Sequence, residues 1–169
     1  IIKNKIKDEK EILILINCRG YAPITICSNC GAKETCDRCD INMVYHKSKH
    51  KMLCHHCGDL KELKKKCISC GKIEKKINLG YGIEKVTEEI KNLFPKTKVV
   101  SLSSDNIKNQ NFSLILKEIE EGNIKIIIGT QIISKGFNFK HLNSVFILDF
   151  DIWFYNTDIR TNEKIFQLA

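Results

Sequence analysis

The sequence lacks the features of a membrane protein. No apolar run approaches the ~20 residues that a membrane-spanning helix requires, and no signal peptide is visible. It also lacks a Gly-x-x-x-x-Gly-Lys-[Ser/Thr] loop, so no segment is predicted to cradle the phosphates of ATP. The chain begins at Ile1 without a Met and ends at Ala169 inside a predicted helix, so we expect a fragment of a longer protein.

The composition fits a folded domain with a basic surface. A hydrophobic content of 43% in 169 residues allows one α/β domain, or a small domain plus an insert. The formal net charge of +8 favours a polyanionic partner such as nucleic acid. A biased genome explains the abundance of lysine equally well, so charge alone does not decide the function.

Three segments of the chain differ in composition. Residues 11–16 form a short continuous apolar run, which is typical of a strand buried on both faces of a parallel sheet. Residues 27–76 are rich in Cys, Lys and His and short of large aliphatic residues, so metal must largely replace a core there. From about residue 80 the pattern alternates between strands and helices, which predicts a parallel sheet with the Cys-rich segment inserted after its first strand. The expected elements are helices at 83–93, 112–121 and from 160, and strands at 98–103, 124–128 and 145–148.

Eight of the nine cysteines form four Cys-x-x-Cys pairs. Each pair can turn both sulfurs toward one tetrahedral ion, and Gly31, Gly58 and Gly71 directly follow three of the pairs, where a positive φ is needed. This spacing in a Lys-rich α/β chain indicates zinc and a reducing cytosol rather than disulfides. The four pairs are Cys27/Cys30, Cys36/Cys39, Cys54/Cys57 and Cys67/Cys70.

Two ions require the four pairs to combine, and three combinations exist. Sequential pairing leaves only five residues between the first two pairs, which is tight for a zinc ribbon. Nested pairing joins the two inner pairs across 14 residues, near the usual ribbon spacing, with a hairpin at 43–53 between them. We favour the nested arrangement, with interleaved pairing next. It predicts an outer site of Cys27, Cys30, Cys67 and Cys70 and an inner site of Cys36, Cys39, Cys54 and Cys57.

Other residues of the Cys-rich segment are weaker candidates. Eight thiolates complete two closed, structural sites, so the alternative ligands His46, His50, His55 and His56 are not expected to bind metal. Cys18 has no partner and is interpreted as a small buried hydrophobe.

Lysines of the same segment form a candidate basic patch. With two Zn²⁺ and eight thiolates counted, the formal charge of residues 27–76 falls from +6 to about +2. The remaining positive charge gathers at residues 61–66 and at Lys47, Lys49 and Lys51. We predict that these three lysines alternate along the hairpin, share one face and contact DNA phosphates; a partner protein or a merely solvated face is the alternative.

A second candidate site follows the 124–128 strand. Gly129-Thr-Gln-Ile-Ile-Ser-Lys-Gly136 would put backbone amides and the Thr130 hydroxyl at the carboxyl edge of a sheet, where ligands bind in open α/β folds. An ordinary strand-to-helix loop has the same spacing, so the order of the motifs along the chain is needed to interpret it.

That order resembles the PriA family of bacterial replication-restart helicases. Asn17-Cys-Arg-Gly-Tyr-Ala-Pro23 precedes the four Cys pairs, and Gly80-Tyr-Gly-Ile-Glu84 follows them. The 129–136 segment, Leu148-Asp-Phe-Asp151 and Glu163-Lys-Ile-Phe-Gln167 come next. The resemblance covers essentially the whole chain.

The resemblance implies a superfamily-2, ATP- and Mg²⁺-dependent 3′→5′ DNA helicase that unwinds stalled forks and initiates primosome assembly. Residues 1–26 and 77–169 would then belong to the RecA-like C-terminal helicase lobe, and residues 27–76 would be its zinc-ribbon-like insert. Implied partners are forked or single-stranded DNA, other primosome proteins and the machinery that loads the replicative helicase, in the bacterial cytoplasm near the nucleoid. Gly129, Thr130, Gln131, Lys135 and Gly136 would form helicase motif V, which links ATP to DNA. The candidate DNA contacts are Arg19, Lys47, Lys49, Lys51 and Thr130.

The chain also departs from the family pattern. Cys18 stands where Arg is expected, which puts the role of that position in doubt. The phosphate-binding loop and the acidic Mg²⁺ motif of the first lobe are absent, and the chain stops where the family continues into its arginine-finger motif. We therefore expect this fragment alone not to hydrolyse ATP. The competing interpretation is a non-enzymatic zinc-ribbon module that binds nucleic acid or protein on an α/β scaffold.

Overall fold

The computed structural model describes residues 10–73, 75–104, 112–130, 133 and 139–149. The chain divides into two compact units, one of Cys18–Val86 and one of Ile1–Asn17 with Thr87–Ala169, and the division falls within one helix. No helix of the described residues is long and apolar enough to cross a membrane.

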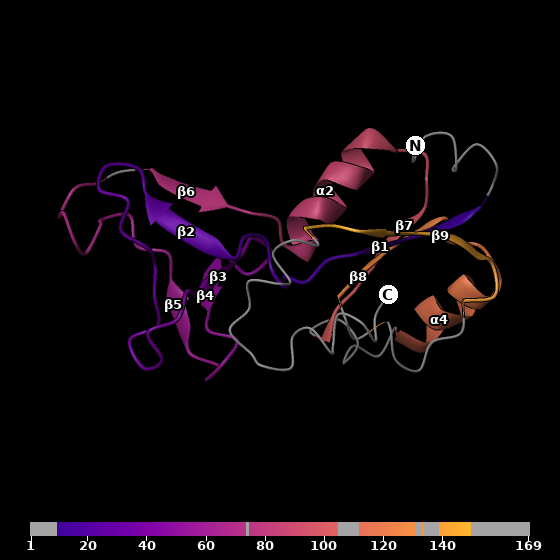
Figure 1. Ribbon diagram of the computed structural model, residues 1–169, viewed down its shortest axis with the longest axis horizontal. Coiled ribbons are helices and arrows are strands. Elements are labelled where there is room, and N and C mark those ends of the chain that lie inside the picture. Colours follow the sequence, from indigo (N-terminus) through magenta and orange to yellow (C-terminus); the bar gives the residue numbers. More distant parts are fainter. Residues whose placement is uncertain (1–9, 74, 105–111, 131–132, 134–138, 150–169) are drawn as a thin grey trace. The chain divides into compact units, whose positions relative to one another are not determined.

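The unit of Ile1–Asn17 and Thr87–Ala169 contains a four-stranded parallel sheet (Figure 1). The strand order is β7-β8-β1-β9, and every neighbouring pair is parallel. The predicted α/β class with a parallel sheet is therefore confirmed. The sheet strands are β1 Glu11–Leu15, β7 Val99–Leu102, β8 Ile126–Gly129 and β9 Leu142–Ile147.

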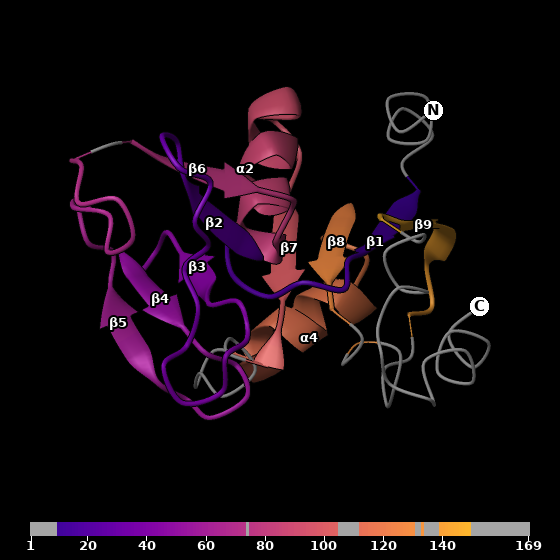
Figure 2. The same ribbon diagram turned by 60° about the vertical axis from the view of Figure 1, so that its left-hand side comes forward.

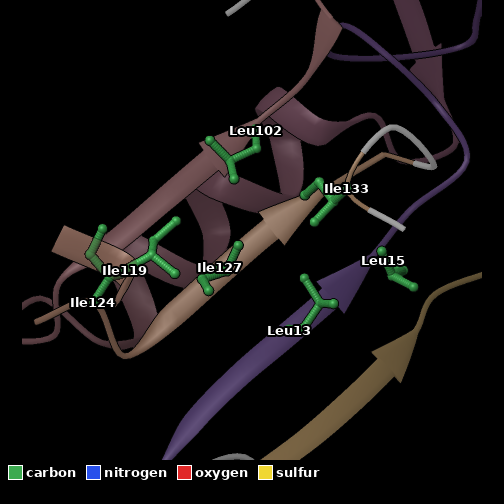
Figure 3. Close-up of a cluster of buried hydrophobic side chains, with 7 residues drawn as sticks. All are labelled: Leu13, Leu15, Leu102, Ile119, Ile124, Ile127 and Ile133. Atoms are coloured by element: carbon green, nitrogen blue, oxygen red, sulfur yellow. The ribbon is translucent and has the colours of Figure 1, made fainter. Parts of the chain in front are cut away.

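The apolar run at the start of β1 is buried on both faces, as predicted. Leu13 and Leu15 point to one face and join a cluster with the helix α4 Phe112–Glu120, whose buried residue is Ile119 (Figure 3). Ile12 and Ile14 alternate with them and are equally buried. The cluster contains Leu13, Leu15, Leu102, Ile119, Ile124, Ile127 and Ile133.

The predicted helices end where their terminal signals lie. Helix α2 spans Ile83–Leu93, which matches the predicted range, and Pro95 follows it. After α4, Gly122 takes a φ of +74° and its amide donates to the Ile119 carbonyl, so glycine ends this helix in the left-handed conformation. The helix predicted from residue 160 lies outside the described residues.

The Cys18–Val86 unit consists of two small antiparallel sheets (Figure 2). Strands β2 Ile24–Cys27 and β6 Lys76–Leu79 form an antiparallel pair. Between them lies a three-stranded sheet, which includes the hairpin predicted at 43–53. Its strands are β3 Val44–His46, β4 Lys51–Leu53 and β5 Leu60–Glu62.

Candidate metal centres

The four Cys-x-x-Cys segments share one backbone conformation. In each, the residue after the second cysteine has a positive φ, and its amide donates to the carbonyl of the first cysteine at 2.9–3.0 Å. Three of these positions are the predicted glycines, and the fourth is Asp40, with a φ of 55°. A second repeated hydrogen bond, from the first cysteine's amide to the carbonyl five residues on, closes each turn at 2.9 Å. The repetition shows that the spacing encodes four equivalent metal knuckles.

The knuckles combine in the nested arrangement. Cys27, Cys30, Cys67 and Cys70 form one cluster and Cys36, Cys39, Cys54 and Cys57 the other, with all sulfurs of a cluster within 4.8 Å of one another. The Cys30–Cys67 and Cys36–Cys57 sulfur distances are 3.6 Å and the Cys27–Cys70 distance is 3.9 Å.

These sulfur distances fit bound zinc and exclude disulfides. A tetrahedron with Zn–S bonds of about 2.3 Å has edges of about 3.8 Å, whereas a disulfide bond is about 2.05 Å long. The donor set of four thiols and the spacing of the sulfurs therefore fit one Zn²⁺ in each cluster, for two ions per chain.

Amide hydrogen bonds lower the pKa of a thiol in each cluster. The Cys57 amide donates to the Cys54 sulfur and is the main cause that lowers the pKa of Cys54 to about 7. The Cys70 amide lowers the pKa of Cys67 to about 6 in the same way. Amide hydrogen bonds favour the thiolate because they offset its negative charge.

Two other thiols ionise less readily than an ordinary cysteine. Hydrogen bonding with the Cys57 thiol, together with burial, raises the pKa of Cys39 to about 12. The Ala32 amide lowers the pKa of Cys30, but burial and the neighbouring thiols raise it to about 11 on balance. A divalent cation favours the ionised form of the thiols that bind it, so metal binding offsets this effect.

Histidines of this unit lie outside both four-cysteine clusters. Among the described residues, both four-ligand clusters are made of cysteine alone, as predicted. The Nδ1 atom of His56 lies 3.4 Å from the Cys39 sulfur, so this ring neighbours a ligand position. His50 is exposed in the β3–β4 turn, with a φ of 52°.

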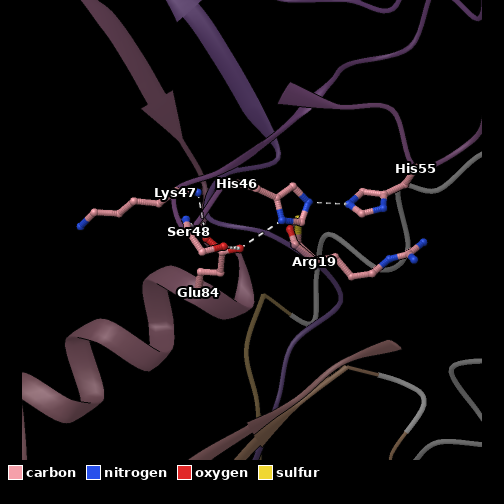
Figure 4. A network of polar contacts seen from close by, with 7 residues as sticks. Arg19, His46, Lys47, Ser48, His55 and Glu84 are labelled. Carbon is pink, nitrogen blue, oxygen red and sulfur yellow. Dashed lines mark hydrogen bonds and ion pairs between the residues drawn. The ribbon is translucent and has the colours of Figure 1, made fainter. Parts of the chain in front are cut away.

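A carboxylate that sequence reasoning did not assign holds the β3–β4 turn (Figure 4). Glu84, in the first turn of α2, accepts hydrogen bonds from the Lys47 amide at 2.8 Å and from the Ser48 amide and hydroxyl at 3.3 and 3.0 Å. It also accepts from Nδ1 of the buried His46 at 3.0 Å. The Nε2 atom of His46 lies 3.1 Å from Nε2 of His55, the residue that follows the ligand-position residue Cys54.

These hydrogen bonds decide the charge of Glu84. Burial raises the pKa of Glu84, but the bonds from His46 and from the amide and hydroxyl of Ser48 lower it below its ordinary value of 4.5. The carboxylate is therefore ionised at neutral pH and stabilises the folded unit there.

We expect Glu84→Gln to lower the free energy of unfolding by about 1–3 kcal/mol at pH 7, because hydrogen bonds to a charged acceptor become neutral ones. The difference from wild type should shrink as pH falls through the folded-state pKa of Glu84, since protonation removes the same charge. Urea unfolding of zinc-loaded protein between pH 7 and pH 4 measures it. Glu89→Gln, an exposed change on the same helix, should stay within about 0.5 kcal/mol of wild type at every pH. An equal effect of both substitutions would remove Glu84 from this role.

The predicted DNA-contacting lysines lie in the β3–β4 hairpin, but not as predicted. Residues 47–50 form the turn, so only Lys51 belongs to a strand, where it pairs with His46 and Glu62. We predicted that Lys47, Lys49 and Lys51 share one face because side chains alternate along a strand. This reasoning is wrong, because the alternation of side chains does not continue through a turn. All three are exposed.

Arg19 lies in the same unit and is half-buried. In Figure 4 its guanidinium extends away from Glu84. The Cys18 thiol donates to the Arg19 carbonyl at 3.2 Å and is half-buried, close to its predicted role as a small hydrophobe.

The candidate coupling loop begins at the carboxyl edge of the parallel sheet. Gly129 is the last residue of β8, in register with Leu15 and Leu102 on the flanking strands. A side chain at Gly129 would collide with buried Ile133. Thr130 follows, buried, and its amide donates to the Leu102 carbonyl at 3.3 Å. Gln131, Lys135 and Gly136 lie outside the described residues.

Fold and clusters together define an α/β protein with a zinc-ribbon unit, and the comparisons with known proteins agree. Residues 36–61, which contain the inner cluster, match the family model described as the PriA DNA helicase Cys-rich region (CRR) domain.

Similarity to relatives extends far beyond the inner cluster. The chain is 40% identical over 168 residues to the replication restart protein PriA of Rickettsia felis, 36% over 165 residues to that of Borreliella burgdorferi, and 32% over 163 residues to that of Bacillus subtilis. These matches cover 99%, 98% and 96% of this chain but 26%, 25% and 20% of the relatives. Along almost its whole length the chain is therefore similar to a portion of these PriA proteins, and it spans about a quarter of their length.

Proposed function

We propose that this chain is part of an ATP-dependent 3′→5′ DNA helicase that recognises and unwinds stalled replication forks and initiates primosome assembly. The observation that carries the proposal is the nested pair of four-cysteine clusters in a chain that matches PriA proteins along 96–99% of its length. In this proposal residues 1–26 and 77–169 belong to the C-terminal helicase lobe, and residues 27–76 are its zinc-binding insert. The protein acts in the bacterial cytoplasm, at the nucleoid.

In the proposed protein each residue group has a separate task. Cys27, Cys30, Cys67 and Cys70 hold one Zn²⁺, and Cys36, Cys39, Cys54 and Cys57 hold the other. Both ions are structural, because four thiolates leave no coordination position open for a substrate. ATP and Mg²⁺ are bound by parts of the helicase that this chain does not supply, since it has no phosphate-binding loop. Arg19 and the lysines of the β3–β4 hairpin contact forked or single-stranded DNA.

An ATPase assay tests the enzymatic proposal. The longer protein that contains this sequence should hydrolyse ATP faster with forked DNA than without it, and should unwind the fork from the 3′ side. Primosome proteins and the helicase-loading machinery should bind the resulting complex. Zinc-loaded protein that binds DNA but neither hydrolyses ATP nor unwinds would support the non-enzymatic zinc-ribbon module instead.

Thr130 offers a test of coupling within that helicase. Its place after β8, at the sheet edge where ligands bind in α/β folds, supports a role in linking ATP to the DNA strand. Loss of one hydrogen bond to a charged phosphate corresponds to about 1.5–3 kcal/mol, or roughly a 10- to 150-fold loss of activity. We expect Thr130→Ala, and likewise Gln131→Ala, to reduce DNA-stimulated ATPase and unwinding by this amount while zinc content stays normal.

Controls distinguish coupling from helix capping. Thr130→Ser keeps the hydroxyl and should retain activity. If Thr130 merely caps a following helix, Thr130→Ala should cost about 1 kcal/mol of stability and leave unwinding at the normal rate. Full unwinding by both alanine variants would remove this loop from the mechanism.

A further inference from the structure

The Cys18–Val86 unit contains a shallow pocket that neither metal cluster uses. Its volume is about 300 Å³, at the lower end of the range for small-ligand sites. The apolar part of the wall comes from Tyr45, Leu63 and Ile73, and the polar part from Asn78 and three lysines. A site of this size accommodates one planar group rather than a folded segment.

The apolar wall combines the ring of Tyr45, which packs against a second ring, with the exposed aliphatic side chain of Ile73. Tyr45 is half-buried, and its ring makes an edge contact with Tyr21, with centroids 6.1 Å apart and planes at 79°. Ile73 is 78% exposed, although it is aliphatic. An exposed isoleucine beside a fixed ring provides an apolar surface for a flat ligand.

The polar wall supplies hydrogen-bond donors and positive charge. The buried Thr25 hydroxyl donates to the Asn78 Oδ1 atom at 2.8 Å, which leaves the amide nitrogen of Asn78 to donate elsewhere. Lys76 is paired with Glu34, and so its charge is compensated. Lys64 and Lys65 are exposed and form no ion pair within the described part of the chain.

Aromatic and basic side chains connect Tyr45, in the wall of the pocket, with the β3–β4 turn. The Lys47 ammonium lies over the Tyr21 ring, 5.0 Å from its centroid, and Tyr21 in turn contacts Tyr45. Lysines interleaved with aromatic rings are typical of surfaces that track a single strand, where bases stack on rings and phosphates meet cations.

We propose that this pocket receives one unpaired base of single-stranded DNA. The base stacks on Tyr45 beside Leu63 and Ile73, and the Asn78 amide donates to an acceptor on its edge. Lys64 and Lys65 contact the flanking phosphates. This inference rests on the proposed DNA-binding function and adds to it a defined site, outside the motor loop, that recognises bases as well as backbone.

The test compares a strand that has bases with one that has none. Zinc-loaded protein is titrated with a fluorescent 15-nucleotide oligo-dT, and with a strand of equal length in which every residue is an abasic tetrahydrofuran. Because stacking one base corresponds to about 1–3 kcal/mol, the wild type should bind oligo-dT roughly 5- to 150-fold more tightly. Tyr45→Phe should keep this ratio, and Tyr45→Leu should bring it close to one.

Two further variants separate the parts of the site. Lys65→Gln should weaken binding of both strands equally and flatten the salt dependence, because it removes a phosphate contact. Tyr45 also packs against the inner cluster, so zinc content and near-UV circular dichroism are checked for its variants. Ile73→Glu, at an exposed position, should abolish the preference for bases without affecting the fold.

Each contrary result has a distinct meaning. Equal wild-type affinity for both strands, or a preference that survives Tyr45→Leu and Ile73→Glu, would overturn the base pocket and leave DNA binding intact. Displacement of Tyr45-dependent binding by an acidic peptide such as poly-glutamate, with no preference for bases, would assign the pocket to a protein partner. Failure to bind either strand would overturn the proposed DNA-binding function as well.

Discussion

Chelation of zinc is expected to unfold the Cys18–Val86 unit and to leave the parallel sheet folded. Within the part of the chain that the structure describes, the buried apolar cluster at the inner metal site contains only Met43 and Met52 besides the cysteines Cys36 and Cys54. Such a core cannot offset the entropy of ordering this segment, whereas structural zinc contributes about 10–16 kcal/mol per site in small zinc-binding peptides. Removal of the ions also takes away the positive charge that offsets the repulsion between neighbouring thiolates.

Hydrogen exchange measures this outcome at individual amides. After chelator treatment the knuckle amides of Gly31 and Gly58 should lose protection, while amides of β1 and β8 keep theirs. Chelator saturated with zinc beforehand serves as the control, and added Zn²⁺ should restore protection. Unchanged protection of the knuckle amides in metal-free protein would show that the unit has a sufficient core of its own.

Gly82→Ala is expected to destabilise the same unit by about 3 kcal/mol. A Cβ atom at Gly82 would lie 2.7 Å from the Gly20 carbonyl carbon and closer still to its oxygen, and backbone atoms cannot rotate away. The close approach allows the Gly82 amide to donate to Tyr21 and the Glu84 amide to Gly20, which satisfies amides at the start of α2. Overpacking of this kind costs about 1–3 kcal/mol, and a clash with backbone belongs at the upper end.

A matched control separates the clash from backbone strain. Gly31 has a φ of +72° with no atom within 4 Å of an added Cβ, so Gly31→Ala carries only the left-handed penalty of about 1–2 kcal/mol. Thermal and urea unfolding of zinc-loaded variants should therefore rank Gly82→Ala below Gly31→Ala in stability. If Gly31→Ala were the less stable variant, the backbone at Gly20 and Gly82 would be able to move apart and relieve the clash.

Features encoded locally could be predicted from the sequence. The buried run of β1, the bounds of α2 and the four knuckles each depend on neighbours within a few residues, and the 14-residue separation of the inner pairs already favoured nesting. The predicted bounds of a strand were less accurate where its first half contains polar residues. Strand β9 begins at Leu142 and continues through Asn143 and Ser144, whereas the apolar run indicated a strand at 145–148.

Features that join distant residues could not be predicted. Glu84 holds a turn 36–37 residues earlier in the chain, and no periodicity indicates that a helical glutamate accepts from Lys47 and Ser48. The pairing of β2 with β6 likewise follows from closure around the metal clusters, so the compact unit extends beyond residues 27–76 on both sides. The hairpin at 43–53 was predicted, but the extent of its turn was not, so strand alternation was assigned to Lys47 and Lys49, which lie in the turn.

Native mass spectrometry tests the central claim that two nested zinc sites build this unit. The wild-type protein should carry two Zn²⁺ per chain. Cys36→Ser should release the inner ion first and leave the outer ion bound, and Cys27→Ser should do the reverse. One ion or none in the wild type, or equal loss of both ions in either variant, would contradict the nested two-site arrangement.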